Sequence, residues 1–79
     1  MKILLFVNTK QNLKKVNNLG GIEILNYDLF NYLKKKNDVV FSNNLSQKIL
    51  STNWDIVISS NDSRIFNQIK SKRKILWLH

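Results

Sequence analysis

Residues 1–36, MKILLFVNTKQNLKKVNNLGGIEILNYDLFNYLKKK, decide the fold of this chain. The apolar run Ile3–Val7 predicts a strand, and a polar loop follows it from Asn8 to about Leu19. Gly20 and Gly21 are both of the glycines in the chain, and they open a predicted helix that extends from Ile22 to about Lys36. A strand, a loop and a helix in this order are typical of the first unit of an α/β domain.

The helix entrance predicts the first candidate site. Apolar side chains recur at helical spacing and predict the face that packs on a sheet: Ile22, Leu25, Leu29 and Leu33, with Tyr32 beside them. Glu23 in the first turn and Lys34–Lys36 in the last turn would both suit the helix dipole. Glycine can adopt positive φ and lets another molecule approach the backbone closely. Because helix N-terminal amides are unpaired, Gly20 and Gly21 predict a cradle for a phosphate or an oxyanion.

The rest of the chain continues the alternation of strands and helices. We expect a strand at 38–42, a turn and a short helix within 43–52, a strand at 54–58 ending in the polar loop 59–61, a helix carrying Ile65, Phe66 and Ile69 with Asn61 or Asp62 as its N-cap, and a fourth strand at 74–78. This alternation predicts right-handed crossovers and a parallel, Rossmann-like sheet with flanking helices. Because no helix follows the fourth strand, we expect residues 1–79 to be one incomplete domain, the front of a larger one.

The composition limits the possible classes of protein. Cysteine is absent, which excludes disulfides and thiolate metal sites. The formal net charge of +8 would attract polyanions, but the lysines are scattered, so we expect most of them to be solvated surface. The remainder could favour an anionic membrane surface. With no signal peptide and no apolar run near the length of a membrane span, the expected location is the cytoplasm, with peripheral contact at the inner face of the membrane as a further option.

Standard motifs for nucleotide binding and catalysis are missing. The glycine pair lacks the third glycine of a dinucleotide fingerprint and the Gly-Lys-Ser/Thr ending of a P-loop. No Ser-His-Asp arrangement, metal cluster or close pair of carboxylates can be assembled, so no metal or cofactor is predicted. Ligands of parallel sheets bind beyond the carboxyl ends of the strands. Four polar stretches are expected there: the loop from Asn8 to Gly21, the turn 42–44, the stretch 59–62, and His79, the single histidine.

The order of these features resembles the N-terminal domain of family-four glycosyltransferases. The resemblance rests on the first strand MKIL, on Gly20-Gly21-Ile22-Glu23, on the strand 54–58 and on the stretch 75–79, ILWLH. Those enzymes have the GT-B fold, in which two Rossmann-like domains face each other across a cleft. The resemblance implies that residues 1–79 are the first four strands of the acceptor-side domain. Most donor-binding residues of the family belong to a C-terminal domain that this sequence does not include.

The resemblance also implies an activity and a set of site residues. The full enzyme would transfer a hexose, with retention, from a nucleotide sugar to a glycan or a lipid-linked acceptor. His79 matches the cleft-lining histidine beside the transferred sugar, and Gly20 and Gly21 would lie near the donor diphosphate and the acceptor. Glu23 matches the glutamate after the glycine pair and is expected to be mainly structural; Asn61 is a further candidate from its strand end. By itself the chain is expected to be inactive, and nucleic acid is not an expected partner.

Two other classes of protein fit parts of the sequence. A non-catalytic basic module that binds nucleic acid or another polyanion would use the positive charge, although RNA-type aromatic motifs and a clustered basic stripe are missing. A flavodoxin-like or receiver-like domain is the other class. A receiver should place acidic residues after its first strand, where this chain has Asn8-Thr9-Lys10.

Overall fold

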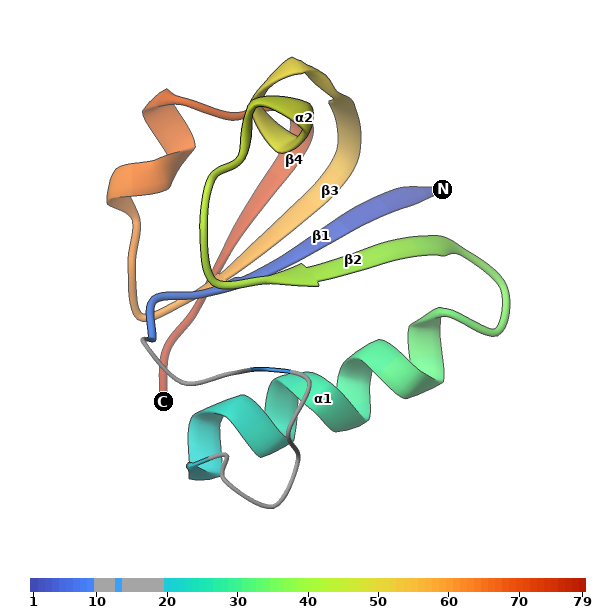
Figure 1. The fold of residues 1–79 in the computed structure, drawn as a ribbon, viewed down its shortest axis with the longest axis vertical. Helices are drawn as coiled ribbons and strands as arrows, with labels where there is room; N and C mark the ends of the chain where they lie inside the picture. Colours follow the sequence, from blue (N-terminus) through green and yellow to red (C-terminus); the bar gives the residue numbers. More distant parts are fainter. Residues whose placement is uncertain (10–12, 14–19) are drawn as a thin grey trace.

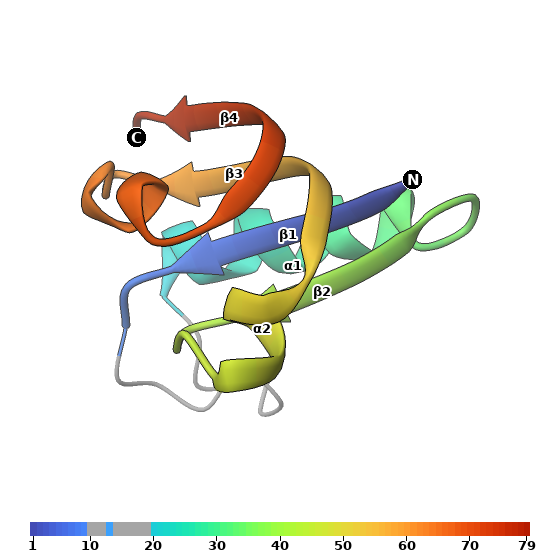
Figure 2. The same ribbon diagram turned by 90° about the horizontal axis from the view of Figure 1, so that it is seen from above.

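A computed structural model describes residues 1–9, 13 and 20–79, and it contains one four-stranded sheet with helices on both faces (Figures 1 and 2). The elements in chain order are β1 (Lys2–Val7), α1 (Gly21–Leu33), β2 (Asp38–Ser42), α2 (Gln47–Ser51), β3 (Asn53–Ser60), the 3₁₀ helix η2 (Arg64–Asn67) and β4 (Lys70–Trp77). Most of the predicted loop 8–19 lies outside the described residues. None of the described helices has the length and hydropathy that a bilayer span requires.

The sheet is parallel throughout, with strand order β2-β1-β3-β4. Helix α1 covers one face, and α2 and η2 cover the other (Figure 2). The predicted α/β class and Rossmann-like parallel sheet with flanking helices are therefore confirmed. From β1 the chain connects to β2 on one side, and from β3 it connects to β4 on the other side. The topological switch point of the sheet therefore lies between β1 and β3.

Strand β1 lies in the centre of the sheet and is buried on both faces. Its residues Ile3–Val7 are at most 5% exposed. Leu4 and Phe6 face α2 and η2, where they join an apolar cluster with Ile49, Trp54, Val57, Ile65 and Ile69. A strand covered on both sides has no solvent-facing positions, which explains why its sequence is continuously apolar.

Helix α1 packs on the sheet only partly as predicted, because Ile22, Leu29 and Leu33 are half-buried but two other predicted residues are exposed. Leu25 is 48% exposed and Tyr32 is 72% exposed, whereas Asn26 is completely buried. The packed side of the helix also contains the buried Asn26 and the half-buried Phe30, whose ring lies 6.3 Å from the ring of Phe41 on β2. The prediction was wrong for Leu25 and Tyr32, and it missed Asn26 because it counted only apolar side chains, whereas Asn26 finds a polar partner inside the fold.

The end of α1 also differs from the prediction. The helix ends at Leu33, so its last turn contains no basic residue. Lys34 is the C-cap, and its ammonium nitrogen lies 5.1 Å from the centre of the Phe30 ring. The three lysines therefore follow the helix, and the first of them contacts an aromatic face.

The second half of the chain has longer strands and less helix than predicted. Strand β2 and the short helix α2 were predicted correctly, and the Ser46 side chain caps α2 by accepting the Ile49 amide at 3.4 Å. Ser59 and Ser60 were predicted as a loop, but they are the buried last residues of β3. The predicted helix around Ile65 is only the four-residue η2, whose N-cap is Ser63. Neither Asn61 nor Asp62 is at the N-cap position, although the Asp62 carboxylate accepts the backbone amide of Arg64, the first residue of η2.

Strand β4 begins at Lys70, four residues before the predicted start, and it forms one edge of the sheet. Its charged segment KSKRK pairs with β3 in continuous register. Lysines on an edge strand keep their charges in water and discourage pairing with other chains. The side chains of Ile75 and Leu76 are 45% and 40% exposed, so β4 is covered much less than the inner strands.

Candidate functional site at the carboxyl edge of the sheet

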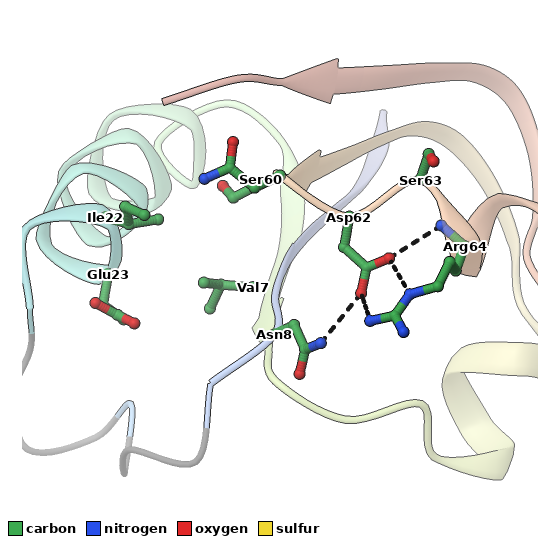
Figure 3. A pocket seen from close by; sticks show the side chains of 9 residues that line it. Val7, Asn8, Ile22, Glu23, Ser60, Asp62, Ser63 and Arg64 are labelled. Atoms are coloured by element: carbon green, nitrogen blue, oxygen red, sulfur yellow. Dashed lines mark hydrogen bonds and ion pairs between the residues drawn. The ribbon is translucent and has the colours of Figure 1, made fainter.

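A pocket of about 400 Å³ opens at the carboxyl ends of β1 and β3, beside the first turn of α1 (Figure 3). It lies at the topological switch point, where parallel α/β sheets bind their ligands. Most of the side chains that line the pocket are polar. The lining residues are Val7, Asn8, Ile22, Glu23, Ser60, Asn61, Asp62, Ser63 and Arg64. Asn61, from the end of β3, and Glu23, from the first turn of α1, thus line one pocket.

One wall of the pocket is a hydrogen-bonded cluster around the buried Asp62 carboxylate. Its Oδ1 accepts the backbone amide and Nε of Arg64, both at 3.0 Å, and its Oδ2 accepts the other guanidinium nitrogen at 2.9 Å. Asn8 Nδ2 donates to the same Oδ2 at 3.2 Å. The side-chain and backbone hydrogen bonds from Arg64 lower the pKa of Asp62 to about 2. The cluster therefore links the end of β1 to the loop after β3 and neutralises the carboxylate.

The glycine pair has ordinary backbone angles. Gly20 is the N-cap of α1 with φ −77° and ψ −180°, and neither glycine has positive φ. A Cβ atom added to Gly21 would meet no atom within 4 Å. The glycines therefore do not use their access to positive φ, because an extended N-cap already turns the chain into the helix. Close approach of a ligand to Gly20 and Gly21 stays a prediction; the pocket itself is lined by the next two residues, Ile22 and Glu23.

Glu23 lies in the first turn of α1 and lines the pocket opposite Arg64 (Figure 3). No hydrogen bond or ion pair joins its carboxylate to another residue in the described part of the chain. Its position suits the helix dipole, which is the mainly structural role expected from the sequence. The same position leaves a carboxylate in the pocket that is available to hydroxyl or amine donors.

His79 lies beside the pocket and contacts two of the residues that line it. Its Nε2 is 3.1 Å from Ser60 Oγ, and its backbone amide donates to Asn61 Oδ1 at 2.9 Å. The imidazole also lies against the indole of Trp77, with 4.4 Å between ring centres. These contacts join the predicted candidates His79 and Asn61 into one group at the ends of β3 and β4.

Asn61 adopts a left-handed backbone conformation, with φ 56°. Asparagine tolerates this region better than most residues. The turn lets the Asn61 amide donate to Trp77 O at 3.0 Å while the side chain accepts from His79. Asn61 therefore fixes the position of the segment that follows β4.

Asn26 was not selected from the sequence, and Ser60 was named only as part of the polar stretch 59–62. Asn26 Nδ2 donates to Ser60 Oγ at 2.7 Å and to Ile22 O at 3.0 Å, and Asn26 Oδ1 is a buried acceptor without a partner. The sequence contained one signal, an amide side chain inside an otherwise apolar helix stripe. The turn 42–44 lies away from the pocket; there Asn43 Nδ2 donates to Thr9 O at 2.9 Å and links β2 to β1.

The described residues contain no group of three metal-ligating side chains. Comparison of the chain with protein-family models, with curated proteins and with solved structures found no match. The chain is a small α/β domain with a four-stranded parallel sheet and a polar pocket at its switch point.

Proposed function

We propose that this chain is the leading part of the acceptor-side domain of a retaining GT-B glycosyltransferase. The full enzyme would transfer a hexose from a nucleotide sugar to a glycan or a lipid-linked acceptor. One observation carries the proposal: the first turn of α1, with Ile22 and Glu23, lines the same pocket as Ser60 and Asn61, and these two residues contact the distant His79. Those two segments are among the four on which the resemblance in sequence rests.

The chemistry of the pocket supports a hydroxylated ligand. Arg64 neutralises Asp62, which leaves the Glu23 carboxylate together with the amides of Asn8 and Asn61 and the hydroxyls of Ser60 and Ser63. Uncharged donors and acceptors with one carboxylate suit the hydroxyl groups of a sugar acceptor. In the proposed enzyme, the first amides of α1 would face the donor diphosphate and stabilise negative charge as the nucleoside diphosphate leaves. Residues of the second domain would complete the donor site.

The test is transfer of labelled hexose from a panel of nucleotide sugars by the complete gene product, including any coding sequence downstream of His79. We expect His79→Ala to lower turnover by about 10²-fold or more, the range for a group that acts on the reacting atoms. Tyr32→Ala is a matched control, because this exposed ring lies near the other end of α1. Equal turnover in His79→Ala and the parent would contradict the site role. Absence of transfer from every donor would contradict the proposed activity.

A second candidate function is binding of a polyanion along β4. Four exposed cations lie within five successive positions of this edge strand and form a basic edge: Lys70, Lys72, Arg73 and Lys74. Lys72 is within 3.6 Å of the Asp55 carboxylate, and Lys74 donates to Phe66 O at 2.7 Å, which reduces the charge that is free to bind. A salt titration of RNA binding separates the two functions, because phosphate contacts predict a steep loss of affinity with salt.

A further inference from the structure

His79 contacts Ser60, and Ser60 in turn contacts the buried Asn26. The neighbours of Asn26 determine which way its side-chain amide is oriented. Asn26 is 0% exposed, and Ile22 O, which can only accept, lies 3.0 Å from its Nδ2. Exchanging the amide nitrogen and oxygen of Asn26 would place two acceptors against each other. The NH₂ group must therefore face both Ile22 O and Ser60 Oγ, and Asn26 acts on Ser60 as a donor.

This orientation leaves the Ser60 proton for another acceptor, and among the described residues the other group within hydrogen-bond distance of Ser60 Oγ is the His79 ring. Ser60 is 4% exposed, and its Oγ accepts the Asn26 hydrogen bond at 2.7 Å. A hydroxyl has one proton to donate, and His79 Nε2 lies 3.1 Å from the same oxygen. Donation to a neutral imidazole requires an unprotonated Nε2. The proton of the ring is then on Nδ1, which has no partner among the described residues.

We propose that Asn26 and Ser60 are positioning residues that hold neutral His79 as the Nδ1–H tautomer. The free Nδ1–H then donates a hydrogen bond to an oxygen acceptor on the ligand, such as a sugar hydroxyl. Trp77 against the ring and Asn61 on the backbone amide hold the imidazole in place while this donor is used. The identity of the ligand rests on the proposed glycosyl transfer, whereas the tautomer rests only on the three hydrogen-bonded side chains.

The arrangement also explains a costly feature of the fold. A buried acceptor without a partner, here Asn26 Oδ1, is unfavourable. An apolar side chain at this position would avoid that cost. It would not direct the Ser60 hydroxyl toward His79. The cost of the Asn26 amide is therefore consistent with a role in directing the Ser60 hydroxyl proton toward His79.

The test is a nitrogen NMR spectrum of the imidazole at a pH of about 8.5, well above the ordinary His pKa of about 6.5. His79 is the single histidine, so its ring signals need no assignment. We expect a protonated Nδ1 and an unprotonated Nε2 in the parent chain. Ser60→Ala should lower the ratio of Nδ1–H to Nε2–H by about fivefold, the ratio that corresponds to one average hydrogen bond. Ser60→Thr keeps the hydroxyl and should restore the parent ratio.

Ser63→Ala is the matched control, because it removes a pocket hydroxyl that does not contact the imidazole. Its ratio should equal that of the parent. A predominantly Nε2–H ring in the parent would overturn the proposal by itself, without any variant. So would an unchanged ratio in folded Ser60→Ala. The spectrum requires no sugar transfer, so failure of the tautomer prediction and failure of the proposed activity are separate results.

Discussion

The two faces of the sheet differ in what is buried on them. The face under α2 and η2 is packed with apolar side chains, among them Leu4, Val57 and Ile65. The face under α1 contains the hydrogen-bonded pair Asn26 and Ser60, which reaches His79 at the open edge. Apolar packing stabilises without directing anything, whereas buried hydrogen bonds impose direction at little net gain in stability. Both faces bury apolar side chains, since Ile3, Leu5 and Val7 of β1 are also buried, and the α1 face adds the hydrogen bonds that organise the site.

The largest expected effect is loss of apolar packing on the α2 face. Leu4→Ala should lower the free energy of unfolding by about 3 kcal/mol, because Leu4 is completely buried within the apolar cluster. Leu25→Ala, at an exposed position of α1, should cost less than about 1 kcal/mol. Urea denaturation of both variants measures the difference. Similar losses in the two variants would mean that α1 packs through its originally predicted face.

A smaller effect is expected from the polar pair on the α1 face. Asn26→Ala should cost about 1–2 kcal/mol, because it removes the bond to Ser60 and leaves space beneath the helix. The double variant Asn26→Leu with Ser60→Ala should unfold within about 1 kcal/mol of the parent, because both partners and the unpartnered acceptor are removed together. Urea denaturation again provides the measurement. A loss well above that in the double variant would show that this pair stabilises the fold and would weaken the comparison.

The smallest effect concerns the Asp62 cluster, which borders the site without belonging to either buried face. The folded pKa of Asp62 is about 2, below the ordinary 3.8, so its contribution is fully present above pH 3.8 and is lost as the pH falls toward 2. We expect a contribution of about 1 kcal/mol or less, because the Arg64 side chain is mostly exposed and solvent screens the pair.

Acid unfolding of Asp62→Asn, followed by circular dichroism, measures this contribution. The variant should start less stable at neutral pH and lose less stability between pH 4 and 2, a window set by the lowered pKa. Some acid sensitivity should remain, because the backbone amide of Lys2 also lowers the pKa of Asp55. Asp28→Asn, on the exposed side of α1, is the control that removes a carboxylate outside the cluster. An unchanged acid profile in Asp62→Asn would contradict the role of the cluster.

Sequence reasoning succeeded where burial leaves a continuous apolar pattern. Strand β2 has the predicted bounds and β1 begins one residue before the predicted apolar run, and the carboxyl-edge location of Asn61 and His79 follows from the parallel topology. It failed where polar residues become buried through partners distant in sequence. Ser60 was predicted as a loop residue, and Asn26 was overlooked, because neither pattern shows that their side chains meet across 34 positions.

The sequence by itself determined the class of fold, because alternating apolar runs and helical repeats can be buried together only as helices packed on a parallel sheet. It also indicated the edge at which a ligand would bind. Only the tertiary structure decided which face of α1 is buried and which groups adjoin His79. The physical reason is that hydrophobic burial follows local periodicity, whereas a hydrogen bond between Asn26 and Ser60 depends on where the fold brings two distant backbones.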